Sequence, residues 1–131
     1  MRFLTLEWAL SDNGSSDDRL QDYHKHLAGI DWSRYRDAGK LITGLDLRGA
    51  KITGMDSGSN LMLELNPLGA NQTSLQIHYT GFRYSLDPLP IGKTIWYDEV
   101  RQEAHNLCHA FLFTDRSEIE IEFDTLDIAK V

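Results

Sequence analysis

His105 and His109 lie four residues apart and are the best candidates for metal ligands in this chain. On a helix both imidazoles would share one face, as in the zinc peptidase motif, but that motif needs a glutamate directly after the first histidine. Here the position is Asn106. On a strand, at ~3.3 Å per residue, the two histidines would lie about 13 Å apart, too far for one zinc ion with ligands near ~2 Å. The sequence therefore predicts no metal and no cofactor, and leaves 103–113 open as strand or helix.

The remaining reactive side chains form no catalytic set. Cys108 stands in an apolar run without a neighbouring Lys or Arg that would lower its pKa, which predicts a buried structural thiol. His24 continues the apolar stripe of an expected helix, which predicts a half-buried core histidine. No phosphate-binding glycine loop is present. No catalytic residue is predicted.

Two aromatic side chains precede two carboxylates at Trp96, Tyr97, Asp98 and Glu99. Asp98 and Glu99 cannot act together as a glycosidase pair, because neighbours on a strand point to opposite faces. The cluster fits either core aromatics followed by a charged strand end, which we favour, or a ligand or partner contact anchored by Trp96 or Tyr97.

The segment 117–123 alternates charged and apolar residues at every step. A strand would place Ile119, Ile121 and Phe123 on one face and Glu118, Glu120 and Glu122 on the other. The negative face has three interpretations: solvated surface, a cross-strand network with cations such as Arg83, Lys93 or Arg101, or a docking surface for a basic partner.

The pattern along the chain predicts an α+β fold. A helix is expected from Asp17 to about Ala28, with Ser16 or Asp17 as cap, and a second helical turn at 32–38. Residues 2–10 fit a strand or a helical turn. Strands are expected at 50–55, 61–65, 75–84, 95–100 and 117–123, with a last short strand near 126–131 and Gly81 as a bulge or close approach. The expected architecture is a single domain, 1–131, with N-terminal helical segments packed on a curved, mainly antiparallel sheet of about six strands.

Charge narrows the classes of partner. The formal net charge is −7, and no run of Lys or Arg reaches three residues. This argues against nucleic acid and against an anionic membrane surface. No apolar run approaches the roughly 20 residues of a membrane helix, and no secretory signal is recognisable, so a cytoplasmic location is expected.

Four segments together resemble a loose group of small uncharacterised bacterial α+β proteins. They are residues 23–27, 96–100, 109–115 and 118–123. The resemblance implies a bacterial source and a helical N-terminus followed by a sheet. It implies no activity and no catalytic residue.

The function predicted from these patterns is a non-enzymatic, acidic protein-binding module, similar in size and charge to bacterial immunity proteins, with a basic protein as partner. The predicted contact residues are Trp96, Tyr97, Asp98, Glu99, Glu118, Glu120 and Glu122. One alternative is a small-molecule-binding protein or enzyme with a pocket between sheet and helices, near Trp96, Tyr97, His105 and His109. Another is a subunit of a homo-oligomer.

Overall fold

The computed structural model describes residues 3–10, 16–35, 46–58, 60–66, 74–85 and 89–130. Within them the chain forms two α-helices and one short 3₁₀ helix, followed by eight strands. The helices are α1 (Leu6–Ala9), α2 (Ser16–Ala28) and η1 (Trp32–Arg34). The predicted α2 is thereby confirmed, and Asp31 caps η1 as predicted, its carboxylate accepting a hydrogen bond from the Ser33 amide. Residues 36–38 of the expected second turn lie outside the described residues.

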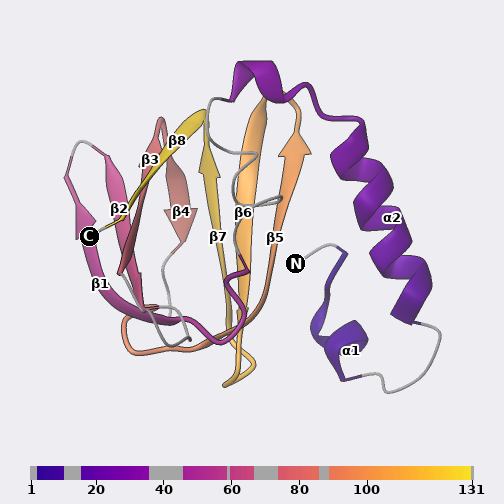
Figure 1. Ribbon diagram of the computed structural model, residues 1–131, viewed down its shortest axis with the longest axis horizontal. Helices are drawn as coiled ribbons and strands as arrows, with labels where there is room; N and C mark the ends of the chain where they lie inside the picture. The colour runs from indigo at the N-terminus through magenta and orange to yellow at the C-terminus, as the bar shows by residue number, and fades with distance from the viewer. Residues whose placement is uncertain are drawn as a thin grey trace.

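The strands form two antiparallel sheets of four, which corrects the expected single sheet of about six. The first sheet has the order β1-β2-β3-β8, with β1 (Lys51–Ser57), β2 (Leu61–Asn66), β3 (Leu75–Thr80) and β8 (Thr125–Lys130). The second has the order β4-β7-β6-β5, with β4 (Arg83–Ser85), β7 (Glu118–Phe123), β6 (Asn106–Phe113) and β5 (Ile95–Glu103). Figure 1 shows the first sheet on the left and the second in the centre.

The two sheets share a bent pair of strands at one corner. β3 pairs with β8 as far as Thr80 opposite Thr125, and the pairing resumes in the second sheet with Arg83 opposite Glu122. The bend passes through Gly81, whose φ is +63°. The Asp124 amide donates to the Thr80 carbonyl at 2.9 Å and closes the turn. The predicted special role of Gly81 is therefore a corner between sheets.

The core lies between the two sheets, and β6 is its central strand. Every residue from Leu107 to Phe113 is buried. Residues 103–113 are therefore strand and hairpin rather than helix, with the turn at Ala104 and His105. On β7 the predicted alternation is confirmed: Ile119, Ile121 and Phe123 are buried, whereas Glu118 and Glu120 are exposed.

Helix α2 covers an edge of the second sheet. It runs alongside β5, the outermost strand (Figure 1). The Val100 amide donates to Tyr23 Oη at 2.8 Å, and the Gln102 amide donates to His26 Nε2 at 2.9 Å. The helix thus satisfies edge amides that would otherwise attract another strand. His24 is exposed, contrary to the prediction, because the face of α2 that meets β5 carries Tyr23, His26 and Leu27.

No helix among the described residues combines the length and the apolar character needed to cross a membrane.

Candidate functional site

A buried chain of hydrogen bonds joins the two sheets. His109 is fully buried on β6; its Nε2 lies 2.8 Å from Asp98 Oδ2, and its Nδ1 lies 2.7 Å from Tyr79 Oη. A carboxylate only accepts, so with a neutral imidazole Nε2–H donates to Asp98 and Tyr79 O–H donates to Nδ1. Burial raises the pKa of Tyr79 well above its ordinary value, which keeps the phenol a donor. Both ring nitrogens of His109 are thus engaged: Tyr79 holds the imidazole through Nδ1, and the imidazole in turn holds Asp98 through Nε2.

Asp98 opens onto a recess at the edge of the second sheet, which we call the edge recess. Its volume is about 250 Å³. It is lined by Leu4, Trp8, Leu20, Asp46, Leu47, Arg48, Tyr97 and Asp98. It therefore lies between β5, the helical N-terminal segments and the turn at 46–48. Of the four residues near which the sequence-based alternative placed a pocket, Tyr97 lines this recess, whereas Trp96, His105 and His109 do not.

Aromatic contacts shape the walls of the edge recess. The rings of Trp8 and Tyr97 meet edge to face, with centroids 4.8 Å apart, and the Arg48 guanidinium lies 4.7 Å from the Tyr97 centroid. A register shift in β5 between Ile95 and Tyr97 interrupts the pairing at Trp96. The Trp96 ring lies against Tyr97 at 5.6 Å and is half-buried.

Short-range hydrogen bonds position the recess residues that come from outside the sheet. Thr5 Oγ1 accepts from the Trp8 amide and caps α1, which sets the direction of the Trp8 side chain. Asp46 Oδ1 accepts from the Arg48 amide and forms a tight turn. The Gly49 amide then donates to the Ile95 carbonyl at 2.8 Å, which joins this turn to β5.

Glu99 performs an internal role that the sequence did not predict. Its carboxylate is fully buried and accepts hydrogen bonds from the Leu4 amide at 2.9 Å, the Phe3 amide at 3.1 Å and Arg101 Nη1 at 2.9 Å. In this arrangement it has no surface for a partner. It ties the N-terminal segment to the second sheet.

Arg101 balances the charge of the buried Glu99 and links it to two glutamates at the protein surface. Its guanidinium also binds Glu103 and Glu120. Burial lowers the pKa of Arg101, but the hydrogen bonds to Glu103 and Glu120 outweigh it and raise the pKa above its ordinary value, so the group stays charged.

The negative face of β7 is divided among three environments. Glu120 binds Arg101, and Glu122 accepts from Asn106 Nδ2 at 2.8 Å. Glu118 is exposed and pairs across strands with Leu112, and Leu112 pairs with Tyr97 on its other side. The cross-strand network predicted as one interpretation therefore forms at Glu120 through Arg101. Lys93 binds Asp115 instead.

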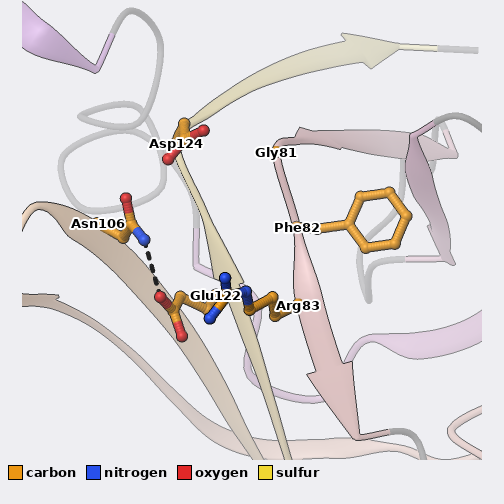
Figure 2. A pocket seen from close by; sticks show the side chains of 6 residues that line it. All are labelled: Gly81, Phe82, Arg83, Asn106, Glu122 and Asp124. Atoms are coloured by element: carbon orange, nitrogen blue, oxygen red, sulfur yellow. Dashed lines mark hydrogen bonds between the residues drawn. The ribbon is translucent and has the colours of Figure 1, made fainter.

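A second pocket, which we call the corner pocket, lies at the bend between the sheets. Its volume is about 450 Å³, and it is lined by Gly81, Phe82, Arg83, Asn106, Glu122 and Asp124. Figure 2 shows Asp124 at one end, Arg83 reaching toward Glu122 at the other, and Asn106 between them. The Phe82 ring points away from these polar groups (Figure 2).

Of the predicted contact residues, Tyr97 and Asp98 line the edge recess, whereas the sequence patterns pointed neither to the other residues of the recess nor to the corner pocket. Trp8, Asp46 and Arg48 are far from β5 in sequence, and no local pattern connects them to it. The corner pocket had one signal, the glycine at position 81 inside a strand pattern.

No family model, no curated protein and no solved structure matches this chain. Among the described residues no three His, Cys, Asp or Glu side chains are grouped so that they could hold a metal ion.

Proposed function

We propose that this chain is an acidic protein-binding module that receives a Lys or Arg side chain of a basic partner in the edge recess. The observation that carries the proposal is the combination of aromatic and aliphatic walls with acidic residues in one recess of about 250 Å³. Lys and Arg have an apolar stem and a charged head. The stem would pack between Trp8, Leu20 and Tyr97, and the head would reach Asp46 and Asp98.

The surroundings of the edge recess support a protein as the occupant. Leu20, on its wall, is 36% exposed, and Leu10, two residues after Trp8, is 49% exposed. A protein interface typically combines such apolar surface with a few aromatic anchors and a polar rim. Glu118 lies two strands from Tyr97, about 10 Å at ~4.8 Å per strand, and would contact a second basic residue of the partner.

The fixed orientation of the Asp98 carboxylate is a further reason to expect a cation in the edge recess. Since His109 holds Oδ2, the carboxylate is fixed before the partner arrives, and no described residue donates a hydrogen bond to Oδ1. A positioned acceptor costs less conformational entropy on binding than a mobile one. The formal net charge of −7 would attract a basic partner over distance.

Titration with Nα-acetyl-arginine amide, followed by tryptophan fluorescence and amide NMR, tests the proposal. We expect Asp98→Asn, which keeps an acceptor for His109, to weaken binding about tenfold by removing the charge. Arg48→Gln should strengthen it, because Arg48 now occupies the face of Tyr97. Asp127→Asn, at an exposed position on β8, is the matched control.

Equal affinity in all four proteins, or equal binding of Nα-acetyl-norleucine amide, would contradict a charge-selective recess. A second candidate function is the binding of a small organic cation in the same recess, which the mixture of apolar and acidic groups that line it also favours. A small amine that binds much more tightly than the arginine amide would favour this second function.

A further inference from the structure

The corner pocket brings four polar side chains together from separate segments. Arg83 comes from β4, Asn106 from β6, Glu122 from β7, and Asp124 from the link to β8. It lies at the end of β6 that begins with Asn106, whereas the edge recess lies beside Leu112, six residues along that strand and about 20 Å away at ~3.3 Å per residue. The two sites are therefore separate.

The backbone at the corner is adapted to the position of Asp124. A Cβ atom on Gly81 would lie 2.1 Å from Asp124 Oδ2, so the carboxylate rests directly over the glycine. The Asp124 amide is fixed by the Thr80 carbonyl. Only a residue without a side chain at position 81 leaves the carboxylate in this place.

The corner pocket has hydrogen-bond acceptors at one end and a donor at the other. Asn106 uses Nδ2 on Glu122, which leaves its Oδ1 as an acceptor beside the acceptor-only carboxylate of Asp124. Arg83, a donor only, stands at the opposite end beside Glu122 (Figure 2). An occupant that satisfies both ends must donate at one end and accept at the other.

We infer that the corner pocket binds a small zwitterion of the α-amino acid class. The ammonium group donates to Asp124 and to Asn106 Oδ1, and the carboxylate accepts from Arg83, for which the planar guanidinium is well suited. Glu122 and Asp124 together outweigh Arg83 by one charge, which disfavours ligands that carry only an anion. The site is independent of the proposed protein-binding function.

The test is an amide NMR titration with four probes: L-alanine, its methyl ester, N-acetyl-L-alanine and D-glucose. We expect L-alanine at millimolar concentrations to shift the signals of Gly81, Asn106 and Asp124. The ester lacks the carboxylate and N-acetylalanine lacks the ammonium, so each should bind at least about tenfold more weakly, because each loses a charge-assisted hydrogen bond.

Two variants separate the two ends of the ligand. Arg83→Gln should make L-alanine and its methyl ester bind equally, and Asp124→Asn should make L-alanine and N-acetylalanine bind equally. Asp127→Asn, exposed on β8 outside the pocket, should change nothing. Absence of shifts at the corner, tighter binding of the ester than of alanine, or tighter binding of glucose would each overturn the inference.

Discussion

Glu99 holds the N-terminal segment against the second sheet with one buried carboxylate. Among the described residues it accepts from two backbone amides, of Phe3 and Leu4, and from the guanidinium of Arg101. Among the described residues every buried side-chain nitrogen and oxygen has a hydrogen-bond partner. A buried charge is tolerated when its partners are complete, and removing one member of such a set is costly. Since Leu4 and Trp8 line the edge recess, this carboxylate also supports the proposed binding site.

We predict that Glu99→Gln lowers the free energy of unfolding by about 3 kcal/mol, because Arg101 loses its buried counter-charge and an amide NH₂ replaces an acceptor. Glu103→Gln is the control: this partner of the same guanidinium is 49% exposed, and its loss should cost less than about 1 kcal/mol. Urea unfolding measures both. Hydrogen exchange at Phe3 and Leu4 should accelerate in Glu99→Gln alone; equal losses in the two variants would contradict the tether.

The lowered pKa values of two carboxyl groups make the stability of the fold depend on pH. The hydrogen bond from Lys93 lowers the pKa of Asp115 to about 2. Burial raises the pKa of Glu120, but the hydrogen bond from Arg101 outweighs it and the pKa falls below its ordinary value of 4.5. In this range the unfolded chain binds more protons than the folded protein, so stability is full above about pH 4.5 and falls as the pH decreases toward 2.

A series of urea midpoints between these pH values checks the acid dependence. Lys93→Gln should make the fall shallower, because Asp115 then titrates nearer its unfolded pKa. Parallel curves for the variant and the parent protein would show that this pair contributes nothing.

At the scale of elements, the corner between the sheets depends on one glycine. Gly81 has a positive φ and carries the Asp124 carboxylate over its Cα. We predict that Gly81→Ala destabilises the fold by about 1 to 2 kcal/mol, the cost of left-handed backbone for a residue with a side chain. Gly58→Ala, where an added Cβ meets nothing within 4 Å, should change stability by less than about 0.5 kcal/mol. Thermal unfolding of the two variants tests this prediction. Equal melting temperatures of Gly81→Ala and Gly58→Ala would show that the backbone at position 81 is not strained by a side chain.

The elements also show how far the sequence predicts the structure. The alternation in β7 and the stripe of α2 are local periods, and local periods place side chains on faces correctly, as at Ile119 and Ile121. The burial of Glu99 depends on amides of residues 3 and 4, more than ninety positions away, which no period reveals. The division into two sheets was not predicted for the same reason, because the alternation within a strand does not indicate where a pair of strands bends from one sheet into the other.

At the scale of the molecule, the helices, the sheet edge and the charge act together. α2 covers the part of the β5 edge at Val100 and Gln102, and the edge recess opens on the same strand beside Tyr97 and Asp98. The proposed partner would therefore approach the part of this edge that the helix does not cover. Tyr97 and Asp98 line the recess there, and Glu118 lies two strands away from Tyr97.

The most direct test of the protein-binding proposal is photo-crosslinking from position 20, on the wall of the recess, in an extract of the source cell. We predict that a photoreactive residue there captures a partner through a segment containing Lys or Arg, identified by mass spectrometry of the crosslinked peptide. The same residue at position 127 should capture none, and Asp98→Asn should clearly reduce the capture from position 20. Equal capture from both positions, or attachment to an acidic or purely apolar segment, would contradict the account.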